Sequence, residues 1–490
     1  MSRGAKARAL RFAAYPAISA LLLAPCYWQP RIQAGDLSSH IYNSWLAQLA
    51  ESGRAPGLAV VRQSTNVLFD LILGGLFRLF GAGPAQRLGA GLAVLVFIWG
   101  AFALAAAISG RRPWNLLPSI AVLAYGWVFH MGFFNFYLAL GLCFWALALA
   151  WSPSPRRLAA AAAILAAAWL AHALPVAWCV GLLAYLAAAR GRTPRVRGLL
   201  TLAALAAITL ARLTLAHAFP TTWSASQIVG ITGADQTLLF GPRYLAAMAG
   251  LLVVWGALFV TLAAQRGAAA VFGSLPFQLA VLSAGAVFLL PSAVLFPEYA
   301  NSLLYIAERM SLAVGVAVCA FLALARPRPV DFAVSAAVAA LFFVFLHGDE
   351  SALNTVEDRL AAAVATVPPG DRVVTLMGNP GSRVNALTHM IDRDCIGRCY
   401  SFANYEPSTR QFRIRAAVGN PFVVSTYKDS VALQCGFYRV KPEDLPMDAI
   451  EMDGQGHMLV RRLEAGDLCG STRSAALAHR PAGMRIQGDR

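Results

Sequence analysis

An aspartate and a histidine stand one helical turn apart, directly after the first apolar segment of the chain. Asp36 and His40 belong to the run from Asp36 to Glu51, in which apolar residues recur at helical spacing. Asp36, His40 and Asn43 therefore share one face of the expected helix. A carboxylate in this place can take a proton from a hydroxyl group as a general base, assisted by His40. Asp is also a favoured helix N-cap, and the two roles are compatible because a capping carboxylate is held rigidly.

Two more histidines stand at short turns between apolar runs. His130 and Asn135 belong to the aromatic segment 129–137, which either forms an aromatic belt at the membrane surface or lines a cavity for a sugar or lipid head group. His172 lies at a second turn and has the same two interpretations, structural or substrate-binding. His130, Asn135 and His172 are therefore candidate substrate-binding residues.

Arginines at the ends of apolar runs are candidates for binding a phosphate group. Arg309 follows Glu308 at the start of one run, and its planar guanidinium suits phosphate oxygens. The alternative for Arg309 is an ion pair near the membrane surface, with Glu308 or with Glu298. Arg243 is a second phosphate candidate, although its long side chain can equally extend to the membrane surface as a solvated cation. Asp235 is either a second acidic site residue or the former of a turn.

The composition is that of a membrane protein. Of the 490 residues, 58% are hydrophobic and 13% are charged, whereas charged residues make up about 25% of a soluble domain. Apolar runs recur between Phe12 and Phe345, each long enough to cross a hydrocarbon core of about 30 Å. We predict eleven transmembrane helices, at residues 12–29, 88–108, 114–130, 134–151, 158–171, 175–190, 198–216, 243–264, 269–290, 306–325 and 330–346.

The net charge of +16 follows from arginines in short loops between the apolar runs, such as residues 111–112, 190–197 and 326–328. This positive-inside pattern places those loops and the basic N-terminus in the cytoplasm, and an odd number of spans places the C-terminus outside. No basic stripe is interleaved with exposed aromatic residues, so nucleic-acid binding has no support. We expect a multi-pass protein of an inner (plasma) membrane, whose first segment is a retained signal anchor.

The first outer loop, residues 30–87, is expected to contain two helices that lie in the membrane interface. The first covers residues 36–51. The second covers residues 67–80, stops at a Gly-Ala-Gly-Pro sequence, and is too short to cross a membrane. Asp36 would then stand at the entrance to the first of the two interfacial helices.

We divide the chain into a transmembrane domain, residues 1–346, and a small extracytoplasmic α/β domain, residues 347–490, where charged residues and turn signals return. The expected elements are a helix at 351–366, strands at 372–377, 421–425 and 457–460, and a disordered tail after residue 470. Cys395 and Cys399 are a candidate disulfide, because oxidising compartments favour disulfides. The alternative is a metal site formed by both cysteines and His389.

Three features occur together in this chain. The first span enters from the cytoplasm, an acidic residue lies close to the membrane in the first outer loop, and an amphipathic segment ends in Leu79-Phe80-Gly81. This arrangement resembles the GT-C superfamily of polytopic glycosyltransferases. The resemblance implies a helical membrane fold, a lipid-linked sugar donor and an acidic catalytic base, for which Asp36 is the matching residue. The outer loops lack an Asp-x-Asp or Glu-x-Asp pair, so no metal ligands are assigned and a divalent metal cofactor is left open. The C-terminal domain lacks the Trp-Trp-Asp motif of oligosaccharyltransferases.

These features predict an enzyme that transfers a sugar, with inversion, from a polyprenyl-phosphate carrier to a glycan, lipid or protein acceptor at the outer face of the membrane. Asp36 would deprotonate the acceptor hydroxyl, and Arg309 or Arg243 would neutralise the departing phosphate. No nucleotide-binding loop, dinucleotide fingerprint or His-Glu-x-x-His motif is present. Two alternatives stay open. A transporter or flippase of a lipid-linked glycan would place polar residues near span midpoints, and a non-catalytic membrane assembly protein would not need Asp36.

Overall fold

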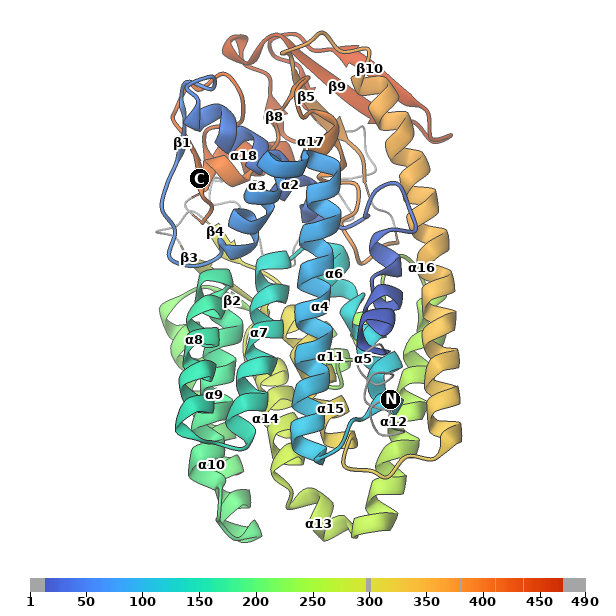
Figure 1. The fold of residues 1–490 in the computed structure, drawn as a ribbon. Coiled ribbons are helices and arrows are strands. Elements are labelled where there is room, and N and C mark those ends of the chain that lie inside the picture. Colours follow the sequence, from blue (N-terminus) through green and yellow to red (C-terminus); the bar gives the residue numbers. More distant parts are fainter. Residues whose placement is uncertain (1–13, 297–300, 379–380, 410, 435, 470–490) are drawn as a thin grey trace.

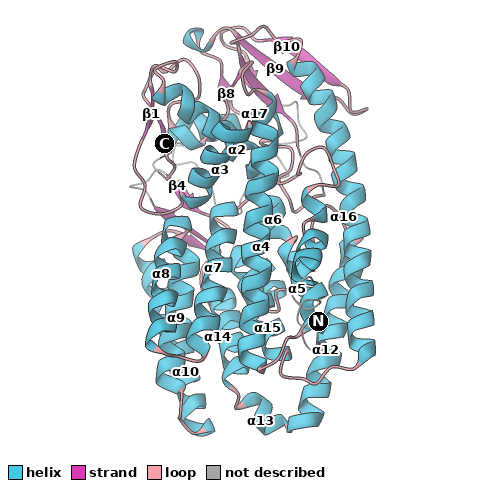
Figure 2. Ribbon diagram, in the orientation of Figure 1, coloured by secondary structure: helices cyan, strands magenta, loops and turns pink. Residues whose placement is uncertain are grey.

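Helices form a bundle, and most of the strands gather at one of its ends (Figures 1 and 2). The computed structural model describes residues 14–296, 301–378, 381–409, 411–434 and 436–469. The first predicted span begins in residues outside this set, and so does the tail predicted to be disordered. We call the end of the bundle that carries the C-terminal strands the capped end.

Five of the described helices are long and apolar enough to cross a membrane. They are α4 (Ala82–Ser109), α7 (Phe134–Trp151), α10 (Pro194–Ala218), α12 (Tyr244–Arg266) and α16 (Pro329–Val364). The remaining bundle helices are α8 (Pro155–Ala171), α9 (Ala173–Ala189), α14 (Leu275–Leu289) and α15 (Ile306–Leu322). The chain thus has the helices of a membrane protein, while the count of eleven spans, the type of membrane and the orientation stay predictions.

Two predicted spans are interrupted helices. The span predicted at 114–130 consists of η2 (Trp114–Leu116), α5 (Leu117–Ala124) and α6 (Trp127–Met131). It is interrupted at Gly126, where a Cβ would lie 2.9 Å from the carbonyl oxygens of Leu123 and Gln236, so the close approach of the segment at Gln236 requires glycine at this position. The span predicted at 269–290 is divided into α13 (Ala268–Phe272) and α14.

Helix α16 runs without interruption through the predicted boundary at residue 346. The helix predicted at 351–366 is confirmed as far as Val364, where it forms the second half of α16. Figure 1 shows this helix rising from the bundle to the C-terminal strands β9 (Met447–Met452) and β10 (Met458–Arg462). The division of the chain into two domains at residue 346 stays a prediction.

The first outer loop contains both predicted helices, α2 (Gly35–Glu51) and α3 (Leu68–Phe80). Helix α3 exposes Leu71, Leu79 and Phe80, as expected for a helix in a membrane interface. Helix α2 differs, since it is buried along most of its length, including polar residues such as Ser39 and Asn43. C-terminal residues such as Glu406 cover its polar face, and the position of α2 relative to a membrane stays a prediction.

Four strands form the main sheet in the order β10-β9-β5-β6, with β5 (Arg372–Leu376) parallel to both β9 and β6 (Tyr400–Ser401). Three smaller sheets consist of β1 (Leu58–Val60) with β7 (Ile414–Ala416), β8 (Tyr438–Arg439) with β11 (Leu468–Cys469), and β2 (Thr221–Thr222) with β3 (Ala293–Phe296) and β4 (Asn301–Leu303). Because β1 pairs with β7, the first outer loop and the C-terminal region share a sheet.

The strands predicted at 372–377 and 457–460 are confirmed as β5 and β10. The strand predicted at 421–425 is wrong. The side chain of Asn420 accepts hydrogen bonds from the backbone of Phe422 (3.0 Å) and Val423 (3.0 Å), which holds this segment in a turn. The remaining short elements are η1 (Ala24–Cys26), α11 (Ser226–Gly230), η3 (Ala234–Thr237), α17 (Met390–Asp394), η5 (Glu406–Ser408), α18 (Tyr427–Gln434) and η6 (Pro442–Asp444).

Candidate active site

Asp36 is the second residue of α2, and Ala34 is the N-cap of this helix. No side-chain hydrogen bond caps the helix, so the interpretation of Asp36 as an N-cap is wrong. Gly132 packs against its backbone with φ +83°, and a Cβ at Gly132 would lie 2.8 Å from the Cα of Asp36. The start of α2 is thus fixed by close backbone packing, while the Asp36 side chain remains 21% exposed.

Arg309 lies in the first turn of α15, and its guanidinium stacks 3.7 Å from the centre of the Phe133 ring. Its Nε atom is buried without a hydrogen-bond partner, and Arg309 forms no ion pair with a carboxylate among the described residues. Asp36 lies close enough to attract the guanidinium electrostatically. The positive charge of Arg309 is therefore available to an anion that binds beside Asp36.

Glu308 does not neutralise Arg309. Its carboxylate accepts hydrogen bonds from Ser226 (2.9 Å) and from Ser292 (2.9 and 3.0 Å). The predicted Glu308–Arg309 pair is therefore wrong, because serine hydroxyls hold the carboxylate of Glu308 in another direction. The other predicted partner, Glu298, lies outside the described residues.

The C-terminal region contributes two side chains to the surroundings of Asp36. The Nε2 atom of His389 lies 3.9 Å from Oδ1 of Asp36, and the ring of Tyr405 lies 5.4 Å from that of His389. Tyr305, the residue before α15, also interacts electrostatically with Asp36 and adopts a left-handed backbone conformation, φ +58°. We call Asp36, Tyr305, Arg309, His389 and Tyr405 the Asp36 cluster.

His40 is oriented by another carboxylate. Its Nδ1 atom lies 2.6 Å from Oδ1 of Asp70, and the amide of Asn135 donates to Oδ2 of Asp70 at 2.7 Å. Burial alone would lower the pKa of His40, but the charge and hydrogen bond of Asp70 raise it to about 9. The imidazole of His40 is paired with Asp70 through Nδ1, and assistance of Asp36 by His40 stays a prediction. Asn135 is part of this Asp70 network and also accepts the Phe69 backbone amide at 2.8 Å.

Glu406 reaches the same face of α2 from the C-terminal region. Its carboxylate accepts a hydrogen bond from Ser39 (2.9 Å), and the neighbouring Asn404 donates to Asn43 (2.8 Å). Burial raises the pKa of Glu406 to about 7, although the charge of His40 acts in the opposite direction. The face of α2 that carries Asp36, His40 and Asn43 is thus the surface on which the C-terminal region docks.

His130 and His172 have structural contacts. The Nδ1 atom of His130 lies 3.0 Å from the carbonyl oxygen of Gln33, and the side chain is fully buried 4.0 Å from Glu350. His172 accepts the backbone amide of Leu174 at 3.2 Å and caps α9. His172 also interacts electrostatically with Arg309.

Arg243 and Asp235 are both held by charged partners. Arg243 forms an ion pair with Asp349 of α16. Asp235 is buried, accepts a hydrogen bond from Ser311 (3.1 Å) and lies 3.7 Å from Arg383. Burial raises the pKa of Asp235 to about 6, although Arg383 acts in the opposite direction. The structure therefore pairs the charge of each residue within the protein and does not join either residue to the Asp36 cluster.

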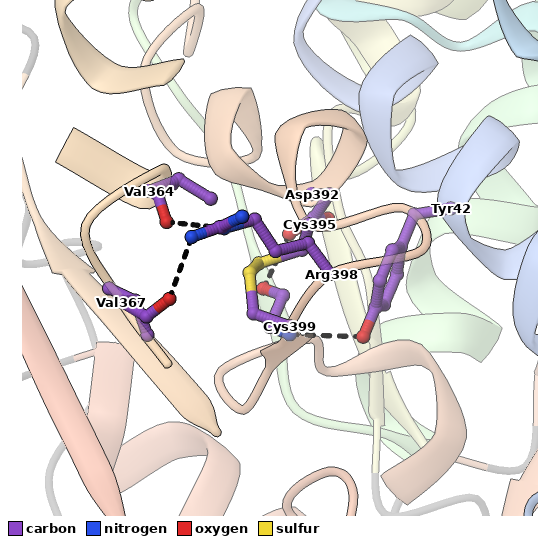
Figure 3. The surroundings of a disulfide bond; sticks show 8 residues. Tyr42, Val364, Val367, Asp392, Cys395, Arg398 and Cys399 are labelled. Carbon is purple, nitrogen blue, oxygen red and sulfur yellow. Dashed lines mark hydrogen bonds between the residues drawn. A yellow bond between two sulfur atoms is a disulfide. The ribbon is translucent and has the colours of Figure 1, made fainter. Parts of the chain in front are cut away.

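Cys395 and Cys399 form a disulfide bond, so that prediction is confirmed (Figure 3). The alternative metal site with His389 is wrong, because both sulfur atoms are used by the disulfide. Among the described residues, no group of three or more His, Cys, Asp or Glu side chains is arranged to hold a metal ion.

Sequence reasoning missed Asp70, Glu406 and Tyr405, and it considered His389 only as a metal ligand. Asp70 had a local signal, because it is an acid in the first turn of an otherwise apolar helix. The other three had none, since they reach α2 only through the fold. Comparisons with known protein families, with curated proteins and with solved structures found no match to this chain.

Proposed function

We propose that the protein is a membrane glycosyltransferase of the GT-C type, which transfers a sugar from a polyprenyl-phosphate donor at the outer face of the membrane. One observation carries the proposal. The partly exposed carboxylate of Asp36 interacts electrostatically with the guanidinium of Arg309, which forms no ion pair with a carboxylate among the described residues. A base and a cation that forms no ion pair among the described residues suit a reaction that removes a proton and releases an anion.

In the proposed reaction, a carboxylate oxygen of Asp36 accepts the proton of the acceptor hydroxyl. The acceptor oxygen then forms a bond to the anomeric carbon of the sugar. The bond between that carbon and the phosphate oxygen breaks, and its electron pair leaves with the polyprenyl phosphate. Arg309 stabilises the negative charge that develops on the phosphate, and its stacking on Phe133 fixes the direction of its N–H groups.

The test compares Asp36→Asn with Glu51→Gln, which changes the exposed acid at the other end of the same helix. Purified protein in lipid nanodiscs is given a panel of radiolabelled polyprenyl-phosphate sugars, and release of polyprenyl phosphate is measured. Asp36→Asn is expected to slow transfer by about 10² to 10⁴-fold, the usual contribution of a general base. Glu51→Gln is expected to leave the rate unchanged. Full activity in Asp36→Asn would remove the basis of the proposal.

A transporter or flippase of lipid-linked glycans is the second candidate, because the helix break between α5 and α6 and the buried Glu350 are features that transporters share. This candidate predicts movement of a fluorescent polyprenyl-phosphate sugar across proteoliposomes without release of polyprenyl phosphate. It also predicts that Glu350→Gln stops this movement, whereas Asp36→Asn does not.

A further inference from the structure

His389 stands between two carboxylates that come from different parts of the chain. Its Nδ1 atom lies 3.2 Å from Oδ2 of Asp392, and its Nε2 atom lies 3.9 Å from Oδ1 of Asp36. His389 is the N-cap residue of α17, but its side chain makes no capping hydrogen bond. The imidazole is therefore held on one side by Asp392, a residue of the helix that His389 precedes, and faces Asp36 of α2 on the other.

We propose that His389 is a positioning residue for Asp36, so that the C-terminal region completes the candidate active site. This inference rests on the proposed function, in which Asp36 is the general base. Asp392 fixes one ring nitrogen of His389, and the other ring nitrogen turns Oδ1 of Asp36 toward the imidazole. The second oxygen of Asp36 then faces the acceptor hydroxyl.

Asp392 is itself held firmly. Its Oδ1 atom accepts a hydrogen bond from the hydroxyl of Ser401 at 2.6 Å, and the side chain is buried. The backbone amide of Ser401 donates to the hydroxyl of Tyr42 on α2 at 3.0 Å. A continuous path of hydrogen bonds therefore connects α2, which carries Asp36, to the carboxylate that orients His389.

The segment after α17 is also fixed covalently. The disulfide between Cys395 and Cys399 closes this turn, and Arg398 inside it donates to the carbonyl oxygens of Val364 (2.9 Å) and Val367 (3.0 Å), at and just beyond the end of α16 (Figure 3). Such support from surrounding groups is what a residue needs if it is to hold a reacting group in one orientation.

Three carboxylates near His389 favour its charged form, Asp392 on α17, Asp36 on α2 and Glu406 on η5. The ring of Tyr405 also lies against the imidazole, at 5.4 Å. Burial alone would lower the pKa of His389, but Asp392 and then Asp36 raise it to about 9. His389 is accordingly an imidazolium at neutral pH, and its attraction for Asp36 is that of an ion pair.

The first experiment measures the contact without any substrate. Hydrogen–deuterium exchange at the C2 carbon of each histidine, followed by mass spectrometry across a pH series, gives the pKa of His389 in nanodiscs. We expect a pKa of about 9 in the wild type and a clearly lower value in Asp36→Asn, because one facing carboxylate is lost. His457, an exposed histidine paired with Asp453, is the matched control and should not respond. An unchanged pKa of His389 in Asp36→Asn overturns the inference.

The second experiment uses the transfer assay. His389→Gln is expected to lower kcat by about 10- to 100-fold, as for other residues that orient a reacting group, and to leave the KM for the donor unchanged. It should also remove the loss of rate at alkaline pH that deprotonation of the wild-type imidazolium causes. His457→Gln should have no effect. If Asp36→Asn is inactive while His389→Gln keeps the wild-type kcat and pH profile, the inference alone fails. If Asp36→Asn is fully active, the proposed function fails and the inference fails with it.

Discussion

At the scale of residues, Arg309 differs from the other candidate arginine in what surrounds its charge. Arg243 is paired with Asp349, whereas Arg309 stacks on Phe133 and leaves its Nε atom without a partner. A half-buried cation without a carboxylate costs folding free energy, which stacking on an aromatic ring only partly offsets. Groups held in this way are common at binding sites, where stability and function conflict.

Replacing Arg309 should therefore separate stability from binding. Arg309→Met is expected to leave the melting temperature unchanged or higher, because the buried charge is removed. It should weaken binding of polyprenyl phosphate by about 10- to 100-fold, since charge-assisted hydrogen bonds contribute about 1.5–3 kcal/mol. Differential scanning fluorimetry and a lipid-binding titration in nanodiscs measure the two effects. Arg243→Met is the control and should bind normally. Normal binding in Arg309→Met would contradict an anion site at this residue.

How much of the site the sequence predicts depends on how far apart the partners are along the chain. Helical spacing placed Asp36, His40 and Asn43 on one face of α2, and the structure agrees. Spacing could not show that His40 pairs with Asp70, 30 residues away, or that His389 approaches Asp36 from the C-terminal region. Such pairs form only when the fold brings distant segments together, so local periodicity in the sequence cannot predict them.

At the scale of elements, α16 joins the bundle to the C-terminal region through one buried carboxylate. Glu357 is completely buried and accepts hydrogen bonds from Gln33 (2.6 Å) and from Arg393 (2.8 Å). One turn earlier, Asn354 accepts the backbone amide of Arg31 at 3.0 Å. The second half of α16 thus contacts both the segment before α2 and the helix α17. Asp36 lies at the start of α2, and His389 directly precedes α17.

Neutralising this carboxylate should loosen the capped end. Glu357→Gln leaves the buried Arg393 without a charged partner, and breaking a buried pair in this way costs about 3–5 kcal/mol. A fall in melting temperature, measured by tryptophan fluorescence, is the expected result. Asp358→Asn is the matched control. Its exposed ion pair with Arg31 should contribute only about 0–1 kcal/mol. Equal effects of the two substitutions would show that Glu357 does not lock the capped end.

The sequence predicted elements well where one long apolar run makes up a segment. The runs that became α4, α7, α10 and α12 are each long and apolar enough to cross a membrane. The sequence did not predict the interruption of the helix at Gly126, where the segment at Gln236 packs closely, or the turn at residues 421–425, where the side chain of Asn420 binds the backbone. In α16 the sequence predicted an end that does not exist. The change in polarity at residue 347 was interpreted as the end of a helix, but this helix continues to Val364.

At the scale of the whole molecule, different groups lie at the two ends of the bundle. The C-terminal sheet and the Asp36 cluster lie at the capped end. At the other end, arginines from the loops donate to the carbonyl oxygens of helix ends, as Arg111 does to Ala323 (2.9 Å), Arg190 to Trp151 (2.7 Å) and Arg266 to Leu324 (3.2 Å). These are the basic loops that the positive-inside pattern assigns to the cytoplasm. The proposed enzyme therefore requires the two ends to face opposite sides of the membrane.

Single added cysteines test this orientation. Val418→Cys lies in the C-terminal region at a residue that is 86% exposed, and Arg195→Cys lies at an exposed position near the start of α10. A membrane-impermeant maleimide applied to intact spheroplasts is expected to label Val418→Cys at once and Arg195→Cys only after detergent is added. Both variants carry Cys435→Ser as well, because Cys435 lies outside the described residues, and the protein with this change alone gives the background; the free cysteines among the described residues, Cys26, Cys143, Cys179, Cys319 and Cys469, are buried. Labelling of Arg195→Cys alone in intact spheroplasts would place Asp36 on the cytoplasmic side. The base would then face away from an acceptor on the outer surface, and the proposed reaction could not occur there.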